Sequence, residues 1–157
     1  MKTLTRSGRT CQSPGLQRGL VVIELAITLP LVLLIMLATA EVGRAIYQYT
    51  TLTKAVEAGS RYYASTALDS SIPDVTKKIT TENLIVFGSP QAGATSVLPN
   101  FFVSNVTEIE LGPLGTIPVD HVRVSANYDY APFISGIPIL GSVASFTMTA
   151  THTMRAI

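Results

Sequence analysis

The feature that most constrains this chain is an apolar run near its start. Residues Leu20–Ala40 read LVVIELAITLPLVLLIMLATA, with one charged side chain in the whole stretch. As a helix, a run of this length spans a hydrocarbon core of about 30 Å. We therefore predict a membrane-spanning helix over residues 20–40, followed by one modest domain.

The charges around the run predict its orientation. Residues 1–19 form a basic leader that has four basic side chains, Lys2, Arg6, Arg9 and Arg18, and no acid. The rest of the chain has seven basic and ten acidic side chains. A basic leader places the N-terminus in the cytoplasm and the C-terminal body outside. Because no basic face remains beyond the leader, nucleic acid is not expected as a partner.

A secretory signal peptide is the alternative for this run. Residues 38–40 could mimic a small-residue cleavage site. Signal peptides, however, have a shorter apolar stretch, and the helical pattern of this chain continues past Ala40. We therefore favour a retained membrane helix.

Two residues are unusual inside the run. Glu24 lies one turn inside the leading edge, where a carboxylate is costly unless it is paired or protonated, so a functional role is the default expectation. Pro30 removes a backbone donor and clashes with the carbonyl of Ala26, which predicts a kink. Thr28 is near enough in sequence to be expected to satisfy the freed carbonyl.

The helical pattern continues beyond the run. Residues 41–65 contain no proline, and apolar or small side chains recur every three or four positions, which predicts one buried stripe. Its members are Val42, Ala45, Tyr49, Leu52, Val56, Gly59 and Tyr63. Glu57 and Arg61 form a supporting pair on another face. We expect the helix to reach about Leu68, so that residues 41–68 form an amphipathic extension.

Gly19 and Glu24 together resemble a processing signal. A small residue that ends a basic leader, followed by an apolar helix with glutamate at its fifth position, is similar to the class III signal of type IV pilins and pseudopilins. The resemblance implies that a prepilin peptidase cuts between Gly19 and Leu20. It also implies that Glu24 binds the new N-terminal amine of a neighbouring subunit, which offsets part of the desolvation cost. The alternative is an uncut signal anchor with an incidental acid.

The extension narrows this resemblance to the TadE-like family, the pseudopilins of the tight-adherence (Tad, Flp) pilus system. The shared features are the early glutamate, the mid-helix proline, a Glu-x-Gly-Arg element and a Gly-x-Arg-Tyr element. The two elements are here Glu41, Gly43, Arg44, Gly59, Arg61 and Tyr62. The chain departs from the family pattern at Leu25, where many relatives have an aromatic residue. It also has Val56–Glu57 in place of the arginine that usually precedes the second element.

The resemblance implies a minor pseudopilin with a structural and assembly role in pilus biogenesis and adherence. The implied partners are the inner membrane, a prepilin peptidase, the major pilin and other pseudopilins. The implied location is the bacterial inner membrane, in a single pass with a periplasmic body, or the assembled pilus. The alternative function is an unprocessed bitopic inner-membrane protein with a small extracytoplasmic binding module.

Residues 69–157 are predicted to form the extracytoplasmic body, which begins with a short helix. Ser71 can cap this helix, Pro73 suits its first turn, and it is expected to end near Asn83. A loop rich in Gly, Pro and Ser follows over residues 88–100.

Strands follow the loop. Residues 121–130 and 144–155 alternate between apolar and polar side chains, which predicts half-buried strands. A third strand is expected within residues 101–111. Short connections favour antiparallel pairing, and the helix stripe is expected to cover the apolar face of the sheet. The fold class is therefore α+β, a long N-terminal helix packed on a small antiparallel sheet, as in pilins.

The apolar connector at residues 131–140 is expected to be irregular. Its sequence, APFISGIPIL, suits a buried loop, a subunit contact or a segment near the membrane surface. The pattern does not decide among these three.

The sequence contains no recognisable catalytic motif. It has no phosphate-binding glycine loop, no Gly-x-Ser-x-Gly elbow and no Cys/His cluster, and its one cysteine, Cys11, lies in the leader. His121 is expected on a polar strand face and His152 on an apolar one, so no metal site is predicted. We expect neither an enzyme nor a bound cofactor, metal or small-molecule substrate.

Overall fold

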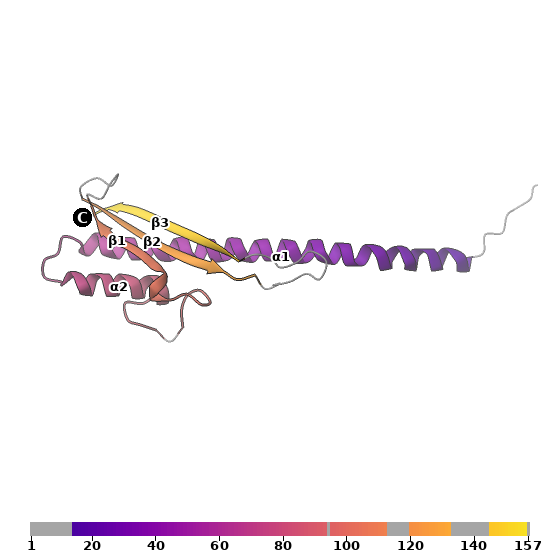
Figure 1. The fold of residues 1–157 in the computed structure, drawn as a ribbon, viewed down its shortest axis with the longest axis horizontal. Coiled ribbons are helices and arrows are strands. Elements are labelled where there is room, and N and C mark those ends of the chain that lie inside the picture. Colours follow the sequence, from indigo (N-terminus) through magenta and orange to yellow (C-terminus); the bar gives the residue numbers. More distant parts are fainter. Residues whose placement is uncertain (1–13, 94, 113–119, 133–144, 157) are drawn as a thin grey trace, which may run out of the picture. The chain divides into compact units, whose positions relative to one another are not determined.

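The structure is a computed structural model that describes residues 14–93, 95–112, 120–132 and 145–156. Two α-helices, a short 3₁₀ helix and three strands follow one another along these residues (Figure 1). Their bounds are α1 Pro14–Thr66, α2 Asp74–Phe87, η1 Val103–Asn105, β1 Val106–Leu111, β2 His121–Tyr130 and β3 Phe146–Arg155. The predicted α+β class is confirmed.

Helix α1 starts earlier than the sequence predicted. It begins at Pro14 and not at Leu20, and it ends at Thr66, two residues before Leu68. Proline suits the first position of a helix because its missing N–H would have no intrahelical acceptor there. No further proline lies between this start and Leu20.

The backbone stays helical through Pro30. The hydroxyl of Thr28 donates to the carbonyl of Glu24 at 2.9 Å and to that of Leu25 at 3.4 Å. A threonine hydroxyl in a helix reaches the carbonyls three or four residues earlier. The carbonyl of Ala26 is only two residues away, and the role expected of Thr28 there was wrong.

The chain divides into two compact units, residues 1–40 and residues 41–157. The described part of the first unit is the beginning of α1, whose large apolar side chains are nearly all exposed between Leu20 and Leu37. The helix is long and apolar enough to cross a membrane. Such a surface needs lipid or protein to cover it.

The second unit contains a three-stranded sheet in the order β1-β2-β3, with both pairs antiparallel. Val124 in the central strand lies opposite Ile109 of β1 and His152 of β3. A register shift between Val106 and Glu108 interrupts the first ladder, as a bulge does. The predicted strands and their antiparallel pairing are confirmed.

One apolar core joins the sheet to the helices of the second unit. The apolar face of β2 is buried along its whole length, as the alternation predicted: Val122, Val124, Ala126, Tyr128 and Tyr130. Helix α1 contributes Leu52, Val56 and Tyr63 to the same cluster. The sheet is therefore covered by the helix that the sequence assigned to it (Figure 1).

The buried stripe of α1 follows a different course from the predicted one at its beginning. Val42 and Tyr49 are exposed, whereas Gln48 is buried and Ala45 is partly buried. Counting back from Leu52, steps of three and of four residues both keep to one helical face. The prediction placed Tyr49 on the buried stripe, and that was wrong, because Gln48 takes the buried position there.

Helix α2 also differs from its prediction at both ends. Ser71 does not cap it, because its N–H and its hydroxyl both donate to Oδ1 of Asp69, at 2.9 and 2.6 Å. These bonds hold the pKa of Asp69 below its usual value. Pro73 occupies the N-cap position instead, and the helix ends at Phe87, followed by the C-cap residue Gly88, whose φ of 69° suits a residue without a side chain.

Candidate functional site

In the first unit, the residue predicted to assemble subunits is Glu24. Its side chain is exposed on α1, with apolar neighbours on either side. Among the residues that the structure describes, none hydrogen-bonds to the Glu24 carboxylate or forms an ion pair with it. If the helix crosses a membrane, this carboxylate is costly there unless it is protonated or is paired with a group from outside the described residues.

The predicted processing residues precede it on the same helix. Gly19 has open space around it, because a Cβ atom added there would meet nothing within 4 Å. Leu20 is exposed. Among the described residues, no packing contact therefore requires glycine at position 19.

In the second unit, the first family element forms a polar cluster with the end of β2. The hydroxyl of Tyr130 donates to Oε1 of Glu41 at 2.5 Å. Nη1 of Arg44 lies 3.9 Å from the same oxygen, and its Nη2 donates to the carbonyl of Ala131 at 3.1 Å. The guanidinium carbon also lies 5.5 Å from the centre of the Tyr130 ring, within cation–π range. We call these four residues the Glu41–Tyr130 cluster.

Glu41 and Arg44 have opposite effects on the Tyr130 phenol in this cluster. Burial, and then the hydrogen bond to Glu41, raises the pKa of Tyr130 above the usual tyrosine value, while Arg44 acts in the opposite direction. The phenol therefore stays protonated and acts as a donor. The cluster connects one turn of α1 to the end of β2, and its two charged side chains remain partly exposed.

The second family element positions the two helices. A Cβ atom added to Gly59 would overlap Cγ1 of Ile85 and lie 2.7 Å from its Cδ1. Thr81, one turn earlier on α2, is also close. The absence of a side chain at Gly59 therefore lets α2 pack closely against α1. Gly43, the glycine of the first element, has open space around it.

Arg61 and Tyr62 have less specific surroundings. Nη2 of Arg61 lies 2.5 Å from Oε1 of Glu57, as the i,i+4 spacing predicted. The arginine side chain is largely exposed, so the pair adds little stability. Tyr62 is partly buried.

Sequence reasoning missed three contacts that hold the second unit together. Tyr130 was predicted as a core residue, but its bond to Glu41 was not, although a buried tyrosine hydroxyl usually finds a partner. Ser60 is fully buried and its Oγ lies 2.7 Å from Nδ1 of His152. Lys77 is buried, and its Nζ lies 3.2 Å from both the carbonyl of Ala67 and Oδ1 of Asp74. No local sequence signal distinguishes Lys77 from a surface lysine.

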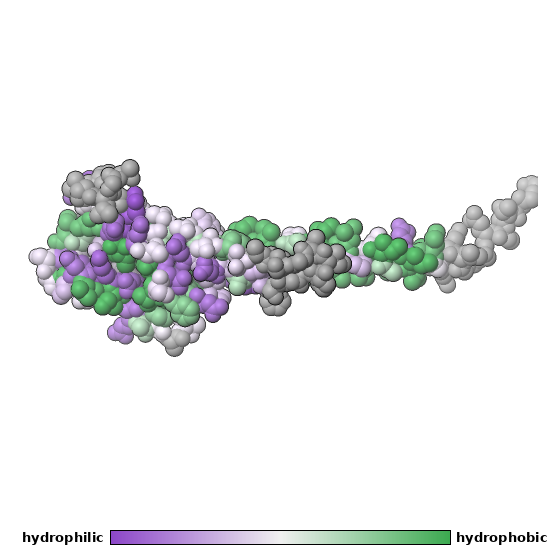
Figure 2. Space-filling view, in the orientation of Figure 1, coloured by the Kyte–Doolittle hydropathy of each residue, from purple (hydrophilic) through white to green (hydrophobic). Residues whose placement is uncertain are grey.

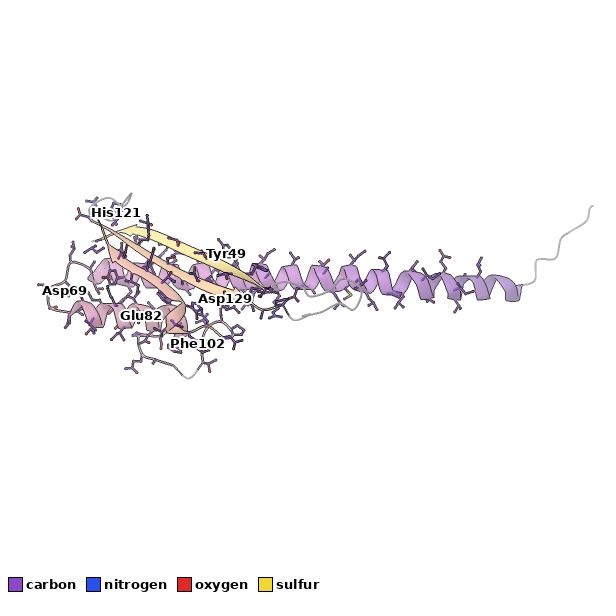
Figure 3. The ribbon with its side chains drawn as sticks, in the orientation of Figure 1. Tyr49, Asp69, Glu82, Phe102, His121 and Asp129 are labelled. Carbon is purple, nitrogen blue, oxygen red and sulfur yellow. The ribbon has the colours of Figure 1, made fainter. Side chains whose placement is uncertain are left out.

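The two histidines lie on different strands, His121 in β2 and His152 in β3. His121 begins β2, with Asp129 near the other end of that strand (Figure 3). Nδ1 of His152 already contacts Ser60. Within the described ranges, no three His, Cys, Asp or Glu side chains lie close enough to hold a metal ion.

These observations first define a class: a single-pass membrane protein whose apolar N-terminal helix leads into a small α+β body. The family model for TadE-like proteins matches residues 19–61. The resemblance inferred from the sequence is thereby confirmed for this segment, which associates the chain with Tad pilus systems. No curated protein and no solved structure shows significant similarity to the chain.

The matched segment contains the predicted processing residues Gly19 and Leu20, both unusual residues of the apolar run, and the first family element. It ends at Arg61, so Tyr62, α2 and the sheet lie outside it. The body is therefore described by its own structure alone.

Proposed function

We propose that this protein is a minor pseudopilin of a Tad-type pilus system, with a structural role in pilus assembly and adherence. Its partners are then a prepilin peptidase, the major pilin and other pseudopilins of the inner membrane. In this proposal the body is periplasmic, carries no catalytic activity and presents surfaces to other subunits.

The observation that carries this proposal is the carboxylate of Glu24. It stands five residues after Gly19 on an exposed apolar helix, without a partner among the residues described. Cleavage after Gly19 would create an ammonium group at Leu20, about one helical turn before Glu24 in the same chain. In the proposal, Glu24 binds the Leu20 ammonium group of a neighbouring subunit. A charge-assisted bond between the two groups would offset the cost of both charges in the membrane.

The test is the N-terminal residue of the protein extracted from membranes of its native host. A start at Leu20 is expected. An intact Met1 would contradict processing and favour the bitopic membrane protein, and a start near Glu41 would indicate a conventional signal peptide.

Two glycine variants sharpen this test. Gly19→Val should leave Met1 in place, because a peptidase that needs a small side chain cannot accept valine. Gly43→Val is the matched control, since that glycine also lies in open space on α1, and it should be processed normally. Both variants should still insert into the membrane, because the apolar run and the charge of the leader are unchanged.

A further inference from the structure

The sheet of the second unit has two edge strands that differ in how well they are protected, because β2 lies between β1 and β3. β1 has six residues, two of them glutamate, and a register shift between Val106 and Glu108. Shortness, charge and bulges are features by which proteins keep an edge strand from pairing with another chain. β3 has ten residues, pairs with β2 without a register shift, and contains no proline, glycine, lysine or acid. Until Arg155 at its end, β3 therefore has none of these protective features.

The hydrogen-bond pattern of the sheet shows which main-chain groups of β3 point away from β2. The N–H of Ala156 donates to the carbonyl of Asp120 at 2.7 Å, and these two residues continue the β2–β3 register. Bonded and unbonded pairs alternate in an antiparallel ladder, so even-numbered residues of β3 bond to β2 and odd-numbered residues direct their N–H and C=O groups outward. The odd-numbered residues are all exposed: Thr147, Thr149, Thr151, Thr153 and Arg155.

We call this row of residues the β3 edge. Within the described ranges, no main chain pairs with it. It runs along the margin of the body in Figure 1, and this margin is mostly white to pale purple in Figure 2, as exposed threonines predict. A row of donors and acceptors with a two-residue repeat matches the main chain of an extended polypeptide.

A groove beside the β3 edge can accept a side chain from an added strand. The groove has a volume of about 360 Å³ and is lined by Ile46 and Tyr49 of α1 and by Phe146 and Met148 of β3. Alternate side chains of an added strand point to the same face of the sheet as Phe146 and Met148. An apolar side chain opposite Met148 would therefore lie over the groove.

Opposite charges mark the two ends of the β3 edge. Asp129 of β2 accepts a hydrogen bond from the hydroxyl of Thr147 at 2.6 Å, so its carboxylate lies toward β3. Arg155 is exposed at the other end. Among the described residues, neither Asp129 nor Arg155 forms an ion pair. An added strand with an acid opposite Arg155 and a base opposite Thr147 would place opposite charges at both ends.

A second copy of the chain fits the β3 edge less well. Two β3 strands paired antiparallel are related by a two-fold axis, which directs the Glu41 ends of the two bodies oppositely. Copies that are anchored in one membrane by the residues before Glu41 need those ends on the same side. In copies of like orientation, β1 would run parallel to β3, and its register shift would interrupt that ladder.

We propose that the β3 edge binds an extended segment of a different protein by antiparallel strand addition. The segment has an acidic residue at its N-terminal end, a basic residue at its C-terminal end and apolar side chains at alternate positions. Main-chain hydrogen bonds supply the affinity, and the groove and the two charges supply the specificity. The inference concerns the body and does not depend on cleavage after Gly19; the membrane anchor enters only in the argument against a second copy.

The probe is a synthetic peptide, acetyl-Glu-Val-Thr-Val-Thr-Val-Thr-Leu-Lys, which carries a fluorophore and is made as two isomers. One isomer is N-methylated at its valines and leucine, whose N–H groups point away from β3 in the proposed register, so it keeps every binding group and cannot pair with itself on the other side. The control isomer carries the same number of methyl groups, on its threonines and lysine, whose N–H groups face β3. Fluorescence anisotropy measures the binding of both isomers to the full chain in detergent.

The first isomer should bind at least about tenfold more tightly than the control, because the control has lost the donors that the β3 edge needs. Thr151→Pro should lose this binding and keep its fold, since proline is tolerated where the N–H of an edge strand faces outward. Thr151→Val keeps the N–H and should bind like wild type. Near-ultraviolet circular dichroism checks the fold of both variants, and the comparison of the two isomers on wild type stands without them.

Equal binding of the two isomers to wild type, or binding of neither, would overturn the proposal. A charge-reversed peptide, with lysine first and glutamate last, should bind several-fold more weakly, and equal binding would reject the antiparallel direction. Sedimentation of the full chain in detergent tests the other occupant. Self-association that Thr151→Pro abolishes would identify a second copy on the β3 edge and would also reject the proposal.

Discussion

Two glutamates on one helix show how differently the two parts of α1 meet their electrostatic needs. Glu41 has a tyrosine hydroxyl at 2.5 Å and an arginine at 3.9 Å, both from within the second unit. Glu24 has no such partner among the described residues. The part of α1 around Glu24 exposes nearly all of its large apolar side chains, whereas the later part of α1 buries Leu52 and Val56 completely.

The contrast indicates which contacts the chain completes by itself. The body pairs two of its buried polar side chains internally: Ser60 with His152, and Lys77 with the carbonyl of Ala67. The membrane part leaves both its apolar surface and its carboxylate unpartnered, as expected of a segment that is completed only by lipid and by other subunits.

The largest effect is expected at Glu24. Glu24→Ala should make the helix easier to insert, by up to about 2.5–3.5 kcal/mol on insertion scales. The same change should reduce association with other pilins, because it leaves a neighbour's ammonium unpaired in a low-dielectric setting. Crosslinking in membranes to the major pilin, compared with wild type and with the Leu25→Ala control, measures the second effect. Unchanged crosslinking with better insertion would mean that the carboxylate is tolerated and not used.

The second prediction compares two glycines of the family elements. Gly59→Leu should destabilise the body by about 3 kcal/mol, since the side chain must displace Ile85 of α2. Gly43→Leu meets open space and should be neutral or stabilising by up to about 1 kcal/mol, because leucine favours helix more than glycine does. Guanidinium unfolding of the full chain in detergent, followed by near-ultraviolet circular dichroism, measures both. Equal stabilities would show that α1 and α2 can separate without cost.

The sequence predicted the elements better than the contacts between them. Strict alternation located β2 and β3, because period-two burial is local to each strand. The course of the buried stripe near Gln48 depended on where the sheet meets the helix, which no local pattern records. Likewise, the family elements marked Glu41 and Gly59 as special. Their partners, Tyr130 and Ile85, lie far away in sequence and became visible only in the fold.

A smaller effect is expected from the Glu41–Tyr130 cluster. Tyr130→Phe keeps the ring and removes the donor, and it should lower the free energy of unfolding by about 1.5 kcal/mol, the low end for a bond to a charged acceptor. The value is at the low end because Glu41 keeps Arg44 nearby. Tyr62→Phe is the control and should change stability by less than about 0.5 kcal/mol. A Tyr130→Phe protein as stable as wild type would show that the bond contributes no net stability.

The smallest effect is the pH dependence of that same difference. The pKa of Tyr130 is raised by burial and by Glu41 in the folded state, so its protonated form is favoured on folding. The stability linked to this group is therefore fully present below the unfolded pKa of about 10 and is lost as the pH rises through the higher folded value. Phenylalanine cannot ionise, so the advantage of wild type over Tyr130→Phe should be constant below pH 9 and shrink above pH 10.

Burial also raises the pKa of Tyr63 and Tyr128, but both proteins lose that stability alike and it cancels in the difference. Unfolding titrations of the two proteins at pH 8, 10 and 11 measure the change, and an advantage that grows with pH would contradict the assignment of Tyr130 as the donor to Glu41.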